Sequence, residues 1–244
     1  MAVFFILKLV LLGVNTLVLV PLIVAVAVFD ENLAYGLCRV WARTNLFFFR
    51  IRVHSRRLAP VDPRGTYVFM SNHASQLDPL ALVAALPEFQ MRWVAKKELT
   101  RVPIFGWGLR RAGHIVIDRS NHMAAIERLR QAGARTKEGI SVIIFPEGTR
   151  SRDEQMLLPF KKGGFMLALE AGIPIVPVAV RGSRPLLPRN EWRIRGGDIE
   201  VVVGAPIPVV GQSRDELIRR LRAFMIAELG LPAEPAARAA AEAS

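Results

Sequence analysis

An uncharged apolar run near the N-terminus constrains the fold more than any other feature of this sequence. The run extends from Leu9 to Phe29 and contains no charged side chain. As an α-helix it would be about 31 Å long, which matches the ~30 Å hydrocarbon core of a bilayer. It therefore predicts a helix that anchors the chain in a membrane. Pro21 leaves open whether this helix spans the bilayer or dips into one leaflet.

Two other interpretations of the run are weaker. A secretory signal peptide would be cleaved at small residues such as those of 25–27, but its apolar region is only about 7–15 residues long and follows a basic cluster. No basic cluster precedes this run. A core helix of a soluble protein rarely continues for so many uncharged residues, so membrane association is the better interpretation.

The remainder of the chain is strongly basic. The sequence holds 33 Lys and Arg against 21 Asp and Glu, for a net charge of +12, and Lys8 is the one charged residue before Asp30. Six arginines follow the apolar run closely, at positions 39, 43, 50, 52, 56 and 57. By the positive-inside rule they predict that the globular part lies on the cytoplasmic face of the inner (plasma) membrane. The same charge would attract anionic membrane lipids.

Charge and cysteine content also exclude several classes of protein. Nucleic acid is the usual alternative partner of so basic a chain, but the sequence contains no DNA- or RNA-binding motif, so we expect no nucleic-acid partner. Cys38 is the single cysteine, which excludes an intrachain disulfide framework and a cysteine-rich zinc site.

Short apolar segments alternate with amphipathic ones after the apolar run. Residues 33–48 predict an interfacial helix, or simply the first helix of the soluble domain. Strands are predicted at 50–54, 66–71, 91–95, 114–117, 141–145, 174–180 and 199–203, and helices at about 79–86, 103–112, 121–137, 161–171 and 213–229. This alternation predicts an α/β fold with a mostly parallel sheet flanked by helices.

The same pattern predicts three regions. Residues 1–50 would form the N-terminal membrane anchor, and residues 51–230 the α/β domain. Residues 231–244 are rich in Ala, Pro and Glu and predict a disordered tail.

The first candidate for chemistry is the polar turn that follows the strand 66–71. It carries Asn72, His73 and, five residues after the histidine, Asp78. Ligands and catalytic groups gather at the carboxyl ends of strands in α/β sheets. A histidine with a carboxylate on one ring nitrogen is a general base of fixed tautomer. The spacing alone is a weak signal, but its position predicts His73 as the base and Asp78 as its orienting partner.

The second candidate is the turn Phe145–Ser151, which again follows a strand. Gly148 allows backbone N–H groups to approach a ligand, Thr149 offers a hydroxyl and Arg150 offers a guanidinium for phosphate. Glu147 could accept a hydrogen bond from a substrate hydroxyl or tie down the loop. Lys161 lies just before the next predicted helix, where a bound anion would compensate the charge. An ordinary solvated basic turn is the alternative.

Two further segments are less specific. Asp118 and Arg119 end a short strand, where a helix-capping aspartate beside a surface arginine would look the same. Residues 175–180 read as a buried strand that contains Pro177.

Together and in this order, the four segments resemble the glycerolipid acyltransferase family, that of the lysophosphatidic acid acyltransferases. Asn72 and His73 with Asp78 match its His-x4-Asp motif. Segment 113–119 matches its second block, 145–151 its third almost letter for letter, and 176–178 its fourth. The second block departs from the pattern, since His114, Val116 and Ile117 stand where an aromatic residue is common.

This resemblance implies a membrane enzyme with no metal and no cofactor. The hydroxyl of 1-acylglycerol-3-phosphate (lysophosphatidic acid), activated by His73, would attack the thioester of acyl-CoA or acyl-carrier protein directly and give phosphatidic acid. Gly148 and Arg150 would hold the glycerol phosphate, Glu147 would help to place the acceptor, and Lys161 would add charge. The full set of residues implied in substrate binding is Asn72, Arg119, Glu147, Gly148, Thr149, Arg150 and Lys161.

Three alternatives remain open. The acceptor could be another lyso-lipid, such as a lyso-ornithine lipid or another lysophospholipid. The chain could be a thioesterase or esterase that uses Ser75 or Cys38, although the Gly-x-Ser-x-Gly elbow is missing from the sequence. It could also be a basic membrane-binding protein without enzymatic activity.

Overall fold

The computed structural model describes residues 2–101, 107, 114–117, 140–151 and 156–232. The predicted helices at 103–112 and 121–137 lie outside these residues, apart from residue 107. Arg119 and all but the first two residues of the predicted tail also lie outside them.

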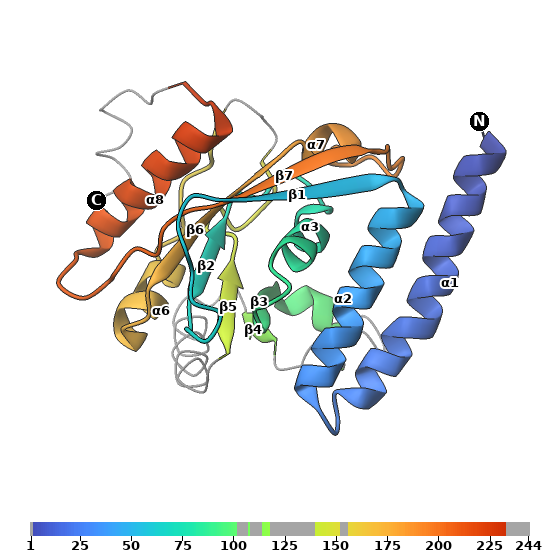
Figure 1. The fold of residues 1–244 in the computed structure, drawn as a ribbon, viewed down its shortest axis with the longest axis horizontal. Helices are drawn as coiled ribbons and strands as arrows, with labels where there is room; N and C mark the ends of the chain where they lie inside the picture. Colours follow the sequence, from blue (N-terminus) through green and yellow to red (C-terminus); the bar gives the residue numbers. More distant parts are fainter. Residues whose placement is uncertain (1, 102–106, 108–113, 118–139, 152–155, 233–244) are drawn as a thin grey trace.

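A seven-stranded sheet forms the centre of the molecule (Figure 1). Its strands are β1 (Ile51–Arg57), β2 (Val68–Ser71), β3 (Met91–Lys96), β4 (Ile115–Ile117), β5 (Ser141–Ile144), β6 (Ile175–Arg181) and β7 (Gly197–Val203). Their order across the sheet is β1-β7-β6-β2-β5-β3-β4. Every neighbouring pair is parallel except β6 and β7. The predicted α/β fold with a mostly parallel sheet is therefore confirmed.

The sheet is covered on both faces, which explains why its central strands are apolar throughout. Successive side chains of a strand point to opposite faces, and in β2 this places Phe69 in one core and Val68 and Met70 in the other. The core around Phe69 includes α3 (Asp78–Ala85). The core around Met70 includes α6 (Gly163–Ala171) and α8 (Arg214–Leu229).

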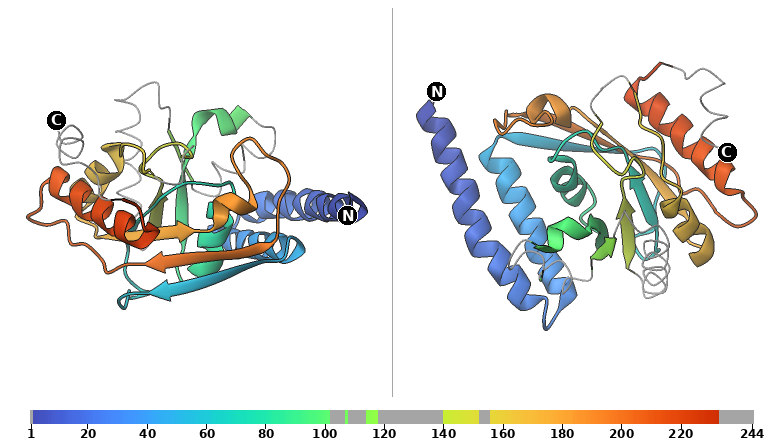
Figure 2. Two further views of the ribbon diagram at one scale, coloured as in Figure 1. Left: turned by 90° about the horizontal axis from the view of Figure 1, so that it is seen from above. Right: turned by 180° about the vertical axis from the view of Figure 1, so that it is seen from behind.

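The N-terminal region is a helical hairpin (Figure 2). It consists of α1 (Ala2–Val26) and α2 (Glu31–Phe48), and Asp30 caps α2 by accepting hydrogen bonds from the backbone N–H groups of Asn32 and Leu33 at 2.8 and 3.0 Å. Polar side chains join the two helices inside the hairpin: Asn15 Nδ2 donates to Asn45 Oδ1 at 3.0 Å, and Trp41 Nε1 donates to Thr16 Oγ1 at 3.2 Å.

The segment Ile6–Val26 is long and apolar enough to cross a membrane, and 11% of its most apolar stretch is buried. A core helix of a soluble protein would be mostly buried, so this interpretation of the apolar run loses its support. The outer side of α1 presents a row of exposed apolar side chains: Ile6, Leu7, Val10, Val14, Leu17, Val18 and Leu22.

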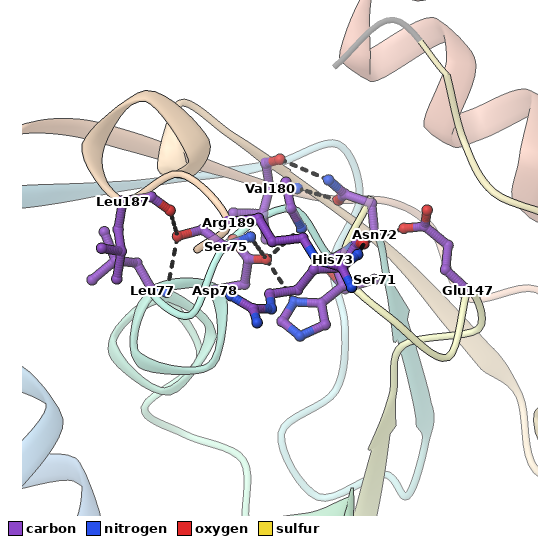
Figure 3. Close-up of polar contacts among 12 residues, drawn as sticks. Ser71, Asn72, His73, Ser75, Leu77, Asp78, Glu147, Val180, Leu187 and Arg189 are labelled. Atoms are coloured by element: carbon purple, nitrogen blue, oxygen red, sulfur yellow. Dashed lines mark hydrogen bonds and ion pairs between the residues drawn. The ribbon is translucent and has the colours of Figure 1, made fainter. Parts of the chain in front are cut away.

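Two short helices were not predicted from the sequence. The 3₁₀ helix η1 (Lys97–Arg101) follows β3, and α7 (Ser183–Leu186) follows β6. The second of these matters for the site, because the chain leaves α7 beside the polar turn after β2 (Figure 3).

Candidate active site

Three turns meet at one edge of the sheet because the strands that precede them are parallel neighbours. β2 pairs with β5 on one side and with β6 on the other. The turns after these strands begin at residues 72, 145 and 182, and they emerge together at the carboxyl edge. This is the position at which ligands bind in open α/β sheets.

His73 and Asp78 form the predicted pair in the turn after β2 (Figure 3). His73 Nδ1 lies 2.8 Å from Asp78 Oδ2, and the same oxygen accepts hydrogen bonds from the backbone N–H groups of Ala74 at 2.7 Å and Ser75 at 2.8 Å. The Asp78 side chain is fully buried, whereas that of His73 is 18% exposed. Since a carboxylate can only accept, Nδ1 carries the hydrogen and Nε2 is the basic nitrogen.

The face of the His73 ring is also fixed. It stacks on the ring of Phe145, with centroids 4.0 Å apart and an angle of 14° between the planes. Phe145 in turn stacks on Trp93 at 5.9 Å. With Nδ1 held by Asp78 and one face held by Phe145, the ring has a defined direction in which Nε2 can accept a proton.

Glu147 joins two segments of main chain. Its Oε1 accepts a hydrogen bond from the His73 N–H at 2.8 Å, and its Oε2 accepts one from the Leu158 N–H at 3.0 Å. Burial raises the pKa of this carboxyl to about 7, although both hydrogen bonds act in the opposite direction. The sequence leaves two roles open for Glu147, which are contact with a substrate hydroxyl and attachment of the loop. The structure shows the second, because both carboxylate oxygens accept hydrogen bonds from main chain.

The main chain of the turn Phe145–Ser151 bends sharply at Gly148. This residue has a φ of +72°, which glycine adopts without strain, and its N–H donates to the Phe145 carbonyl at 3.0 Å. Thr149 and Arg150 follow and are half-buried. Lys161 is exposed just before α6, and its N–H donates to the Pro146 carbonyl at 2.8 Å. The fold therefore brings Gly148, Thr149 and Arg150 into the turn next to that of His73.

Asn72 makes contacts within the protein. Its Nδ2 donates to the Val180 carbonyl at 2.9 Å, and its Oδ1 accepts from the Val180 N–H at 2.8 Å. The side chain thereby extends the β2–β6 pairing by one step beyond Ser71. Whereas the sequence suggests a substrate contact, the structure gives this buried amide a supporting contact under the His73 turn.

Two residues near the site make contacts that the sequence does not predict. Ser75 Oγ donates to the Leu187 carbonyl at 2.8 Å, and Arg189 Nη1 donates to the Arg150 carbonyl at 2.7 Å (Figure 3). Both contacts tie the segment after α7 to the polar turns. The two residues of each bond are 112 and 39 positions apart in the chain, which is too far for a local sequence pattern to indicate the contact.

The candidate nucleophiles of a hydrolase are poorly suited to that role. Ser75 is fully buried, and its hydroxyl is bonded to main chain. Cys38 lies on α2, where burial raises the pKa of its thiol to about 11 and so disfavours the reactive thiolate.

His114 makes a contact between two strands of the sheet. Its Nδ1 accepts a hydrogen bond from the Trp93 N–H at 3.1 Å, which joins the start of β4 to β3. Burial, assisted by Arg92, lowers its pKa to about 3, so the ring is neutral. Arg119, the candidate residue in this block, lies outside the described residues.

A hollow of about 230 Å³ borders the site. Its walls include His73, Glu147 and Ser151 from the first two turns and Arg181 from the end of β6. The carboxyl edge of the sheet thus combines an oriented histidine, a basic turn and a hollow.

Comparison with known proteins identifies relatives over most of the chain. The family model described as Acyltransferase matches residues 50–181. The chain is 35% identical over 172 residues to 1-acyl-sn-glycerol-3-phosphate acyltransferase alpha from Homo sapiens, an alignment that covers 70% of this chain and 60% of that protein. It is 41% identical over 141 residues to the 1-acyl-sn-glycerol-3-phosphate acyltransferase of Cocos nucifera, covering 57% of this chain and 45% of that protein. The chain spans about half the length of the curated relatives it matches.

A solved structure shares the fold. The crystal structure of the 1-acyl-sn-glycerophosphate (LPA) acyltransferase PlsC from Thermotoga maritima aligns with a TM-score of 0.75 and 22% sequence identity. The alignment covers 96% of this chain and 99% of that chain, so the N-terminal hairpin and the sheet domain both have counterparts there.

Proposed function

The chain belongs to the acyltransferase family, and on this premise we propose that it acylates the sn-2 hydroxyl of 1-acylglycerol-3-phosphate and produces phosphatidic acid. The donor is the thioester of acyl-CoA or acyl-carrier protein. The observation that carries the proposal is the pair of His73 and Asp78, 2.8 Å apart at the carboxyl edge of the sheet with Nε2 as the basic nitrogen. The names of the relatives support the choice of acceptor.

The reaction follows from the direction of the His73 ring. Nε2 removes the proton of the acceptor hydroxyl as the oxygen attacks the carbonyl carbon of the thioester. The resulting imidazolium is stabilised by Asp78 on its other nitrogen. When the tetrahedral intermediate collapses, the carbon–sulfur bond breaks and the thiolate takes the proton from Nε2. The histidine is thereby restored without an acyl-enzyme.

The turn after β5 supplies the groups for the acceptor phosphate. Gly148 opens its main chain to a ligand, Arg150 offers a guanidinium, and Thr149 offers a hydroxyl. Lys161 adds charge from the start of α6, and Arg119 completes the proposed set. In this account Glu147 and Asn72 act by positioning, because their polar atoms bond to the main chain around His73 and Val180.

The hairpin of α1 and α2 fits the location of such an acceptor. Lysophosphatidic acid resides in a bilayer, and the exposed apolar side of α1 would hold the enzyme at that surface. The arginines that follow the apolar run favour the cytoplasmic face and attract anionic lipids.

Replacing Arg150 tests the identity of the acceptor. With Arg150→Ala we expect the apparent KM for 1-acylglycerol-3-phosphate to rise by at least about tenfold, while the KM for acyl-CoA changes little, because the lost guanidinium binds phosphate. The measurement is initial-rate kinetics with each substrate varied in turn, and Arg220→Ala, an exposed arginine on α8, is the matched control.

The opposite pattern, a rise in the donor KM alone, would assign this turn to acyl-CoA. The enzyme could also acylate a lyso-ornithine lipid, or another lyso-lipid without a free phosphate, at a rate that Arg150→Ala does not change. That result would replace the proposed acceptor with this class of lipid.

A further inference from the structure

The segment 187–196, which connects α7 to β7, is attached at its beginning to both polar turns of the site. The Leu187 carbonyl accepts the hydroxyl of Ser75, which lies between His73 and Asp78. Arg189 donates to the main chain of Arg150. Figure 3 shows the bond between Ser75 and Leu187, and draws Arg189 in the same group of side chains as His73 and Asp78. The segment therefore contacts both of the turns that carry the proposed chemistry.

The chain just after this segment, at the first residue of β7, is attached to the end of the helical hairpin. The N–H of Gly197 donates to the carbonyl of Arg50 at 3.1 Å, and Arg50 follows α2 directly after Phe49. Lys8 of α1 places its Nζ 5.9 Å from the centroid of the Phe49 ring. Segment 187–196 thus lies where α2 ends and α1 begins, between the hairpin and the site (Figure 1).

The middle of the segment exposes an aromatic and a basic side chain in succession. Trp192 is 70% exposed, and Arg193 is also exposed. Outside the hairpin, Trp192 and Val210 are the most exposed large apolar side chains among the described residues. Tryptophan has a large apolar body with a polar N–H and is enriched at membrane–water interfaces for that reason.

The charge around Trp192 indicates what kind of surface this segment would contact. Arg193 and Arg50 are both exposed, and Lys8 lies at the same end of the hairpin. Basic side chains close to an anionic bilayer contribute about 1 kcal/mol each. Glu191, which precedes Trp192, pairs with Arg195 at 3.0 Å, so the surroundings of Trp192 remain basic. A tryptophan in basic surroundings, beside an apolar hairpin, matches the headgroup layer of an anionic membrane.

We propose that segment 187–196 is a second membrane contact, in which Trp192 enters the interfacial layer of an anionic bilayer while Arg193 and Arg50 meet the headgroups. The purpose of this contact rests on the proposed function, because only a membrane-resident acceptor needs the site at the bilayer surface. Through Ser75 and Arg189, the contact holds the His73 and Arg150 turns at the surface from which the acceptor is drawn.

The direct test is a fluorescent probe at position 192 of the full chain. Trp192→Cys in a Cys38→Ala background gives a single thiol for an environment-sensitive label. Val210→Cys is the matched control, since it is 82% exposed and lies in the loop before α8, at the opposite end of the molecule from the hairpin (Figures 1 and 2). The labelled proteins are bound to vesicles of phosphatidylcholine and phosphatidylglycerol with brominated acyl chains.

We expect bromine to quench the probe at position 192 and to leave the probe at position 210 unchanged. An unquenched probe at 192 on vesicle-bound protein would overturn the proposal. Protection of position 192 by acyl-carrier protein in solution, without quenching on vesicles, would assign the segment to that acidic partner instead.

Kinetics separate this inference from the proposed function. Trp192→Ala should lower kcat/KM by about tenfold for an acceptor embedded in anionic vesicles, and by less than about twofold for a short-chain acceptor dissolved as monomers. Val210→Ala should change neither value. An equal loss with both acceptors would make the segment a support of the site and overturn the membrane contact. Failure of the wild-type protein to acylate either acceptor would contradict the proposed function, whereas the quenching result would still decide the inference.

Discussion

The His73 side chain owes its orientation to three neighbours with different physical roles. Asp78 fixes the tautomer through Nδ1, Phe145 supports one face of the ring, and Glu147 holds the main-chain N–H. Each neighbour comes from a segment that the sheet places beside the others. The proposed base is therefore oriented before a substrate arrives, and little reorganisation would remain for the moment of reaction.

Glu147 should give the protein a characteristic dependence of stability on pH. Its pKa is raised from the ordinary value of 4.5 to about 7 in the folded state. Between these values the folded protein holds a proton that the unfolded chain has released, so its contribution to the free energy of unfolding is complete below about pH 4.5 and is lost as pH rises through about 7. We expect the loss to reach as much as about 3 kcal/mol.

The measurement is denaturant unfolding in detergent from about pH 5 to about pH 8, for the wild type and for Glu147→Gln, which does not titrate. As pH rises, the free energy of unfolding of the wild type should fall relative to that of Glu147→Gln. Parallel curves would contradict a raised pKa at this carboxyl.

Residues 72–78 show what sequence can and cannot reveal at this scale. The pairing of His73 with Asp78 is predictable because both lie in one turn, five residues apart. The bonds of Asn72 to Val180 cross 108 residues, and those of Glu147 to His73 cross 74. A motif identifies such residues as important, but only the fold separates a positioning role from direct contact with substrate.

At the scale of elements, the junction between β6 and α7 determines where segment 187–196 reaches the site. Gly182 lies at this junction with a φ of +80°. A Cβ at this position would lie 2.7 Å from the Asp198 carbonyl oxygen of β7. Only glycine permits both the left-handed turn and this close approach of main chain.

Gly182→Ala should therefore destabilise the protein by about 2–4 kcal/mol, through backbone strain and steric conflict together. The matched control is Gly172→Ala at the end of α6, which has a φ of +67° but no neighbour within 4 Å of the added Cβ. We expect about 1 kcal/mol for the control, since only the cost of the dihedral remains.

Thermal or denaturant unfolding of the two variants provides the comparison. Equal losses would show that the contact with Asp198 has no energetic weight and that the main chain of β7 can move away.

The boundaries of most strands were predictable from the sequence, but the direction of one was not. Apolar runs such as 141–145 and 174–180 match β5 and β6 to within one or two residues, because buried strands must be apolar throughout. β7 runs antiparallel to β6, and an apolar run contains no information on direction. The four residues of α7 are too few to show a helical period.

At the scale of the whole molecule, the hairpin has two different sides. The outer side of α1 is apolar and exposed, whereas α2 packs onto the sheet domain. Tyr35, Leu46 and Phe49 share one core with the sheet residues Phe69 and Val176. A connection of this kind would keep the site at a fixed position relative to the membrane. The apolar run predicts the anchor from sequence, whereas the packing of α2 on the sheet depends on contacts that the sequence does not reveal.

Attachment to the membrane should therefore resist salt. At about 1 M salt the Debye length falls to about 3 Å, which removes most of the attraction between a +12 chain and anionic lipids but leaves apolar burial intact. We expect the full chain to remain in the sedimented membrane fraction after a high-salt wash and to be released by detergent. Release by salt alone would mean that charge, and not α1, attaches the protein.

The proposed role of His73 is to activate an acceptor hydroxyl for direct attack on a thioester. It is tested by measuring thiol release from acyl-CoA, and from acyl-carrier protein, with the detergent-purified protein, with and without 1-acylglycerol-3-phosphate. His73→Ala and Asp78→Asn are assayed beside the wild type. We predict release that requires the acceptor, a loss of at least about 100-fold in His73→Ala, and a smaller but clear loss in Asp78→Asn. Release without the acceptor, or a His73→Ala variant that retains as much as about a tenth of the wild-type rate, would contradict the account.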